Sequence, residues 1–158
     1  ILPALREAGV TAIKIEGRQR GRAYIAGVVR SFRGILAALD DPIERLREIA
    51  RLHLGRLGRD KALAVVFQVE LRQSTKFMER FSSTQLREYL GIIRGVIADG
   101  QARGVFRAAI SPTLAAKLFF GALDEMATNW ILSRRKYTLA SEADAIVELF
   151  VGGLAQRR

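Results

Sequence analysis

The chain has 158 residues, no cysteine and a formal net charge of +10 at pH 7. This length suits one domain with a substantial hydrophobic core. The lack of cysteine excludes disulfide bonds, thiolate catalysis and cysteine-ligated metal, and the basic balance favours anionic partners such as nucleic acid or phosphate-bearing ligands. No apolar run approaches the ~20 residues that span a bilayer, so we expect a cytoplasmic protein without a membrane segment.

Residues 1–40 differ in pattern from the rest of the chain. Residues 10–15 (VTAIKI) alternate and are β-branched like a strand, residues 17–22 form a basic loop with two glycines, and residues 24–39 show helical spacing. A lone strand has no partner for its backbone hydrogen bonds. We therefore predict an N-terminal appendage over residues 1–40, irregular or strand plus helix, and a separate domain over residues 41–158.

Residues 41–158 predict an all-α domain. Asp41-Pro42 and Ser111-Pro112 each place a capping side chain before a proline at the first helical position, and Ser141 with Asp144 resembles a capping box. Residues 74–83 are expected to form a loop or a broken helix. Apolar spacing predicts helices from residue 42 to 55 or 58, and over residues 61–73, 84–104, 111–135 and 141–154.

The two C-terminal helices have more apolar surface than one core requires. In residues 111–135 only a narrow strip of Lys117, Gly121, Asp124 and Thr128 is polar or neutral, and a helix apolar around most of its circumference must be buried on more than one side. Residues 141–154 carry one apolar stripe and an opposite side of mostly small residues, which permits close helix approach. We expect a second subunit to cover this surface.

Three segments of this domain carry a resemblance to a known family. Residues 66–73 (VFQVELRQ), 97–106 (IADGQARGVF) and 119–126 (FFGALDEM) resemble the C-terminal effector-binding domain of TetR-family transcriptional regulators, in the fatty-acid-responsive branch. The second segment is general to TetR regulators, whereas the first is more specific for acyl-CoA sensing. The likeness covers about two-thirds of the chain.

The resemblance implies a function and an assembly. It implies a non-enzymatic domain of a repressor of fatty-acid metabolism that senses long-chain acyl-CoA, or a similar amphipathic ligand, and needs no cofactor. It also implies a homodimer in which the two C-terminal helices pack with their twofold mates as a four-helix bundle. The residues expected at this dimer interface are Leu118, Met126, Ala145, Leu149, Gly152 and Gly153.

Residues 1–40 lack the helix-turn-helix that precedes a TetR effector domain. Instead, residues 2–10, 14–20 and 24–30 resemble a segment of the U32 peptidase-like family. DNA binding is therefore expected only through a head domain that is not recognisable in this chain. Two alternatives stay open, namely a fragment of a U32 peptidase-like enzyme and a helical dimerisation module without a ligand.

The candidate ligand-binding residues combine an apolar lining with a few polar anchors. Aromatic residues at helical spacing can line an acyl tunnel, although ordinary core packing explains the same pattern. Asn129 lies one turn from Glu125 and can anchor polar ligand atoms or form a structural hydrogen bond, and cations of residues 66–80 can hold phosphates or face solvent. The candidates are Phe67, Gln68, Leu71, Arg72, Lys76, Phe119, Phe120, Leu123, Asn129 and Trp130.

Other motifs point to structure rather than chemistry. His53 is the only histidine and has no obvious catalytic or ligating partner, so we expect it at the surface or at the core boundary. Gly91 and Gly95 lack the lysine and hydroxyl residue of a phosphate loop, and we expect them to mark a close helix contact. The sequence predicts no catalytic constellation and no metal site.

Overall fold

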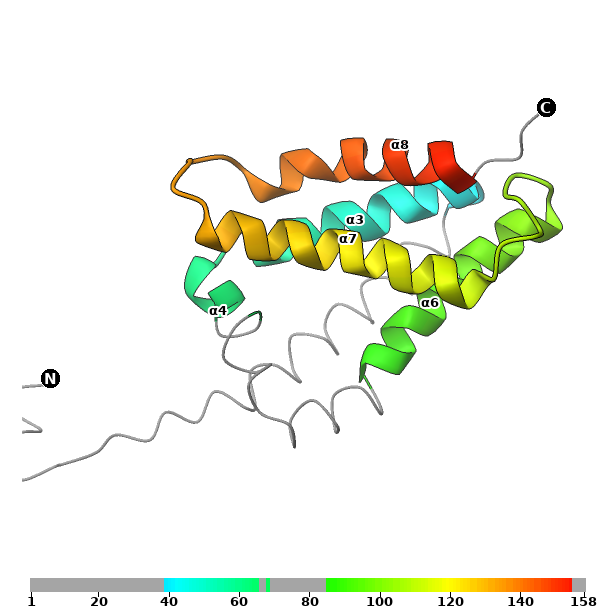
Figure 1. The fold of residues 1–158 in the computed structure, drawn as a ribbon, viewed down its shortest axis with the longest axis horizontal. Coiled ribbons are helices and arrows are strands. Elements are labelled where there is room, and N and C mark those ends of the chain that lie inside the picture. The colour runs from blue at the N-terminus through cyan, green and yellow to red at the C-terminus, as the bar shows by residue number, and fades with distance from the viewer. Residues whose placement is uncertain (1–38, 66–67, 69–84, 155–158) are drawn as a thin grey trace, which may run out of the picture.

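A computed structural model describes residues 39–65, 68 and 85–154 (Figure 1). The expectations for the strand, the basic loop and the segment of residues 74–83 lie outside these residues. The described elements are α3 (Pro42–Leu57), α4 (Lys61–Val65), α6 (Gln85–Ala102), α7 (Pro112–Leu132), the 3-10 helix η3 (Leu139–Glu142) and α8 (Ala143–Leu154). The described part of the chain is thus all-helical, which confirms the predicted fold class.

Helix α3 lies at the centre of the described helices. It contacts α4, α6, α7, η3 and α8, and Figure 1 shows α7 and α8 running side by side in front of it. Its sequence explains this place, because apolar residues recur every three or four positions along the helix. The buried residues of this face are Pro42, Leu46, Ile49, Ala50, His53, Leu54 and Leu57.

Both predicted proline starts are confirmed. The Asp41 carboxylate accepts a hydrogen bond from the backbone N–H of Ile43 at 2.8 Å, and the Ser111 hydroxyl accepts one from Leu114 N–H at 3.4 Å. Each side chain satisfies a backbone donor that has no partner inside its helix.

The ends of the last two helices differ from the prediction. Helix α7 stops at Leu132, because the backbone of Ser133 is extended. Ser141 does not cap α8; its hydroxyl donates to the carbonyl of Thr138 at 2.7 Å, within η3. Asp144 instead accepts two hydrogen bonds from Arg51 of α3, at 2.9 and 3.0 Å. These bonds hold the pKa of Asp144 below its usual value.

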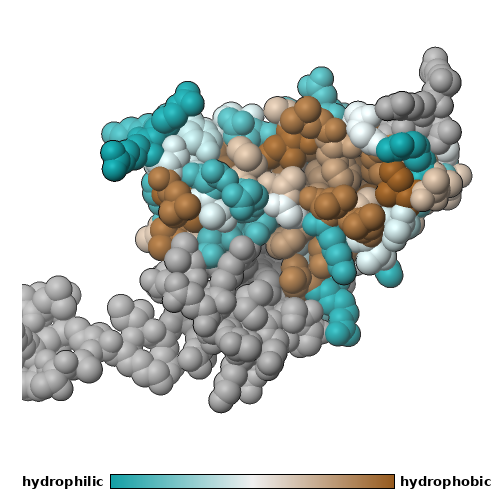
Figure 2. Space-filling model, viewed as in Figure 1, coloured by the Kyte–Doolittle hydropathy of each residue, from teal (hydrophilic) through white to brown (hydrophobic). Residues whose placement is uncertain are grey.

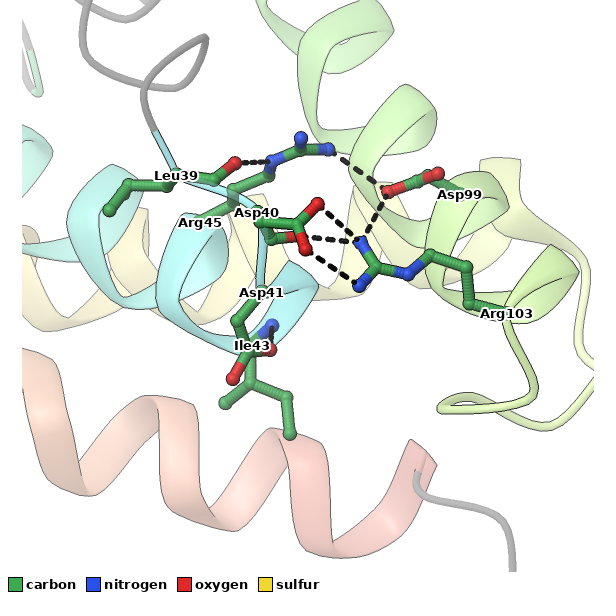
Figure 3. Close-up of polar contacts among 7 residues, drawn as sticks. All are labelled: Leu39, Asp40, Asp41, Ile43, Arg45, Asp99 and Arg103. Carbon is green, nitrogen blue, oxygen red and sulfur yellow. Dashed lines mark hydrogen bonds and ion pairs between the residues drawn. The ribbon is translucent and has the colours of Figure 1, made fainter.

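A charged cluster joins the start of α3 to the end of α6 (Figure 3). Arg45 donates to the carbonyl of Leu39 at 2.6 Å and to Asp99 of α6 at 3.0 Å. Arg103 donates to the side chain of Asp40 at 3.3 Å and lies 3.6 Å from Asp99. The two arginines thereby tie residues 39–45 to the last turn of α6.

The turn after α6 depends on Gly100. The carbonyl of Gly100 accepts hydrogen bonds from the N–H groups of Val105 and Phe106 at 2.8 and 3.1 Å, and the chain reverses through Gly104 with a φ of +72°. The Phe106 ring is 1% exposed and lies against Gly100, where an added Cβ would be 2.3 Å from Phe106 Cδ2. The close approach therefore requires glycine at position 100.

The expected close helix contact at Gly91 and Gly95 is not present among the described residues. A Cβ added at either position would meet no atom of these residues within 4 Å, and Gly95 is exposed. The spacing of two glycines is therefore not sufficient to identify a tight helix crossing.

Substitution of these glycines by alanine should have opposite effects. Gly100→Ala should destabilise the domain by about 1–3 kcal/mol because the new methyl group overlaps the Phe106 ring. Gly95→Ala, in the same helix, should stabilise it by about 0.5–1 kcal/mol because alanine favours the helical backbone. Urea denaturation of both variants measures the difference; equal free energies of unfolding would contradict the contact.

Candidate ligand site

Four polar side chains from separate segments meet inside the helical core. They are His53 of α3, Gln68, Tyr89 of α6 and Asp124 of α7, and we refer to them as the polar cluster. Their exposed fractions are 6%, 3%, 4% and 8%. His53 Nδ1 and the Tyr89 hydroxyl share a hydrogen bond of 3.0 Å, and Gln68 Nε2 donates to Asp124 Oδ1 at 2.9 Å.

The half-buried ring of Phe120 borders the polar cluster. Its centroid is 6.0 Å from the His53 ring and 5.6 Å from the Tyr89 ring, with an edge-on orientation to both. The His53 and Tyr89 rings are themselves nearly parallel, with centroids 5.8 Å apart. This arrangement of rings fixes the orientation of the imidazole next to an aromatic surface.

The imidazole of His53 is neutral at physiological pH. Burial lowers its pKa from 6.5 to about 4, although the negative charge of Asp124 acts in the opposite direction. A neutral imidazole has one nitrogen that donates a hydrogen bond and one that accepts. His53 therefore supplies polarity without positive charge.

Two atoms of the polar cluster have no partner among the described residues. His53 Nε2 and Gln68 Oε1 are buried and make no hydrogen bond within this part of the chain. A buried polar atom without a partner costs about 1–3 kcal/mol, and such atoms in native proteins usually face water or a ligand. The polar cluster can therefore hydrogen-bond a bound molecule.

Two expectations about this region are wrong. His53 was expected at the surface or boundary, and Asp124 was expected on a polar strip of its helix, yet both are buried. The reason is the same in both cases. Each side chain occupies a core position of its helix and has a polar neighbour there, Tyr89 for His53 and Gln68 for Asp124.

The structure brings two predicted ligand residues into this region and places others elsewhere. Gln68 belongs to the polar cluster, and Phe120 borders it. Phe119 and Leu123 are fully buried core residues, and the Phe119 ring packs 4.9 Å from that of Phe150. The candidates Phe67, Leu71, Arg72 and Lys76 lie outside the described residues.

The remaining two candidates lie near the C-terminal end of α7. Asn129 is exposed and donates to the Glu125 carboxylate at 2.6 Å, so the structural hydrogen bond considered as its alternative role is present. Trp130 is half-buried and donates from Nε1 to the carbonyl of Tyr137 at 2.9 Å. The Lys61 ammonium lies 5.5 Å from the Trp130 ring centroid.

His53, Tyr89 and Asp124 were not among the candidates drawn from the sequence. A signal was present, because each continues the apolar spacing of its helix. His53 follows Ile49 and Ala50 by one turn, and Asp124 follows Phe120 by one turn. A polar residue at such a position needs a buried partner.

The expected interface residues lie on the outer side of α7 and α8. Leu118 is 59% exposed and Leu149 80% exposed, and Ala145, Gly152 and Gly153 are also exposed. Met126 is half-buried. Figure 2 shows hydrophobic side chains over this part of the surface.

The described residues contain neither a candidate metal site nor a membrane-spanning helix. Within the described ranges, no group of three histidine, aspartate or glutamate side chains could hold a metal ion. No described helix is long and apolar enough to span a bilayer.

The neutral, buried state of His53 predicts a pH-dependent stability. An unfolded histidine binds a proton below pH 6.5, but the folded chain does so only below about pH 4. Above pH 6.5 the buried neutral imidazole therefore does not reduce the stability of the fold. As the pH falls from 6.5 to about 4, the free energy of unfolding decreases by about 3 kcal/mol, because the unfolded chain gains a proton that the folded chain does not bind. His53→Gln should reduce the difference in unfolding free energy between pH 7 and pH 4 by this amount. Equal pH dependence of the two proteins would contradict a buried neutral imidazole.

Known proteins share this arrangement of helices. Residues 22–153 match the TetR C-terminal family described as "YsiA-like protein, C-terminal region". This match includes residues 22–40, which the sequence assigns to the appendage, and the domain boundary at residue 41 stays a prediction. The fatty acid metabolism regulator protein of Bacillus subtilis is 32% identical over 111 residues, which make up 70% of this chain and 57% of that protein.

Two solved structures are also similar. The fatty acid degradation regulator FadR from Bacillus halodurans has 30% identity and a TM-score of 0.78, over 84% of this chain and 71% of that chain. FadR from Bacillus subtilis in complex with stearoyl-CoA has 27% identity and a TM-score of 0.78, over 83% of this chain and 70% of that chain. Because the family match covers residues 22–153, most of the chain, the chain belongs to the TetR C-terminal family of YsiA-like proteins.

Proposed function

We propose that the chain is the effector-binding and dimerisation domain of a TetR-type repressor of fatty-acid metabolism, and that it senses a long-chain acyl-CoA. The observation that carries this proposal is the polar cluster, in which His53 Nε2 and Gln68 Oε1 are buried without a partner among the described residues and the Phe120 ring borders His53. An amphipathic ligand has both an apolar chain for aromatic surroundings and polar groups for such atoms.

The relatives support the ligand class. One is a regulator of fatty acid metabolism, and another was crystallised with stearoyl-CoA. The net charge of +10 suits a ligand with phosphates. The unpartnered polar atoms favour a ligand site over a dimerisation module without a ligand, since a core that serves packing alone is more stable when it is apolar.

The chain spans 57% of the length of the Bacillus subtilis relative. We propose that DNA is a partner only through a head domain, which is not recognisable in this chain. We propose a cytoplasmic, non-enzymatic role, as the relatives are regulators. The match over residues 22–153 does not favour the alternative of a U32 peptidase-like enzyme fragment.

The outer side of α7 and α8 supports a homodimer. Leu114, Leu118 and Leu149 are 53%, 59% and 80% exposed in the single chain. Added Cβ atoms at Gly121, Gly152 and Gly153 would meet no atom of the described part of the chain within 4 Å, so these positions leave room for a partner helix to approach. Large exposed apolar side chains gathered on one side of a domain are typical of an interface.

Binding of palmitoyl-CoA tests the ligand assignment. Trp130 is the only tryptophan, and its half-buried ring should change its fluorescence when a chain enters the neighbouring core. At 100 times the Kd, palmitoyl-CoA should stabilise the fold by about 2.7 kcal/mol, seen as a higher Tm. Coenzyme A without an acyl chain is the control. An unchanged Tm and unchanged fluorescence at saturating palmitoyl-CoA would refute acyl-CoA sensing.

A substitution that introduces a charge at the proposed interface tests whether this surface forms the dimer. Leu118→Glu places a carboxylate on the apolar outer side and should raise the dimer dissociation constant by at least tenfold, as measured by sedimentation equilibrium. Thr113→Glu makes the same charge change on α7 beside the groove with α6, and should leave the dimer intact. A monomeric wild-type chain, or equal dissociation constants for both variants, would contradict the interface.

A further inference from the structure

A surface groove between α6 and α7 carries positive charge from both helices, which pack against each other (Figure 1). The groove has a volume of about 500 Å³, which lies within the range of ligand sites. Arg87 and Arg94 of α6 and Lys117 of α7 line it, and its lining within the described part of the chain contains no aspartate or glutamate. We refer to it as the basic groove.

The three cations of the basic groove are not neutralised by the described residues. Each is exposed, and within the described ranges no hydrogen bond or ion pair joins its side chain to another residue. In a groove between α3 and α8, by contrast, Arg51 is paired with Asp144 at 2.9 Å. Cations that share a groove without a carboxylate attract anions, and three of them favour a ligand with more than one negative charge.

The less exposed part of the lining is apolar and includes a glycine. Leu86 and Leu90 are half-buried and Ala116 is buried. Gly91 lies in the interior of α6, where glycine is less favourable than alanine, yet a Cβ added there would meet no described atom within 4 Å. Packing among the described residues therefore does not require this glycine, and its missing side chain leaves the groove open.

We propose that the basic groove binds a nucleotide that carries more than one phosphate. Phosphate oxygens match guanidinium and ammonium donors, and a flat base buries apolar surface against the two leucines. The nucleotide comes from one of two sources, a free molecule or the nucleotide end of an acyl-CoA. The second source rests on the proposed function, whereas the first does not depend on it.

Two glycine substitutions in α6 test the groove without changing its charge. Gly91→Leu places an isobutyl group in the groove, whereas Gly95→Leu adds the same group at an exposed position that does not line it. Both variants should fold, because leucine favours a helix more than glycine does. In an NMR titration with adenosine 3′,5′-bisphosphate, Gly95→Leu should bind like the wild type, and Gly91→Leu should bind about tenfold more weakly because the base loses its apolar contact. Equal affinity of the two variants, or no binding to the wild type, would overturn the proposal.

A second pair of variants tests the charge of the groove. Lys117→Gln and Arg135→Gln each remove one positive charge, but Arg135 is exposed and lies outside the groove. Lys117→Gln should weaken binding of the bisphosphate about fivefold, the effect of one exposed ion pair, and Arg135→Gln by less than about twofold. The affinity should also fall as salt rises from about 50 to 500 mM, because exposed charges are screened. Equal affinity of these variants, or an affinity independent of salt, would contradict recognition of phosphate.

Palmitoyl-CoA distinguishes the two sources of the nucleotide. If the groove holds the nucleotide end of the effector, Gly91→Leu weakens palmitoyl-CoA binding relative to Gly95→Leu, and palmitoyl-CoA displaces the bisphosphate. If the nucleotide is a separate ligand, Gly91→Leu leaves palmitoyl-CoA binding unchanged and both molecules bind together. Either result supports the nucleotide site. Bisphosphate binding without palmitoyl-CoA binding would refute acyl-CoA sensing and retain this site, and palmitoyl-CoA binding without bisphosphate binding would overturn the site alone.

Discussion

The hydrogen bond between Gln68 and Asp124 sets the main constraint on this helical domain. It joins two buried polar residues, Asp124 (8% exposed) and Gln68 (3% exposed), within a largely apolar core. Breaking this bond removes the Asp124 acceptor from the buried Gln68 amide, and loss of a partner by a buried donor costs more than the bond itself contributes. Helix α7 must therefore keep its distance and rotation relative to Gln68. His53 and Tyr89 impose the same requirement on α3 and α6.

Helices α3 and α6 carry two kinds of contact at different points along their length. In their interior, His53 and Tyr89 contribute to the polar cluster. At their ends, Arg45 and Arg103 join Asp99 to residues 39 and 40 (Figure 3). The part of the chain that leads into the domain is thus fixed to the same two helices that border the candidate ligand site.

The helices could be predicted from the sequence because their signals are local. A capping side chain followed by proline located the starts of α3 and α7 to the residue, and apolar spacing located α6 and α8 to within a few residues. The end of α7 and the role of Ser141 could not be predicted. They depend on the extended backbone after Leu132 and on the contact of Asp144 with Arg51, which lies 93 residues away in sequence.

The site was only partly predictable for the same physical reason. Gln68 and Phe120 were identified through a family resemblance, but the partners of Gln68 and of His53 come from other helices. An isolated histidine or aspartate in a helical pattern gives no information about what faces it across the core. The position of His53 and Asp124 on the apolar faces of their helices indicated that they are buried. Their hydrogen-bond partners, Tyr89 and Gln68, become apparent only when the helices are assembled.

The central claim is that the polar cluster lies at the effector site. His53 is the only histidine, so nitrogen-15 NMR of the histidine-labelled chain gives one pair of imidazole signals. We predict a neutral imidazole at pH 6 and a change in the Nε2 signal when palmitoyl-CoA binds, with Nδ1 less affected because it stays bonded to Tyr89. A protonated imidazole at pH 6, or an Nε2 signal unchanged at saturating palmitoyl-CoA, would contradict it.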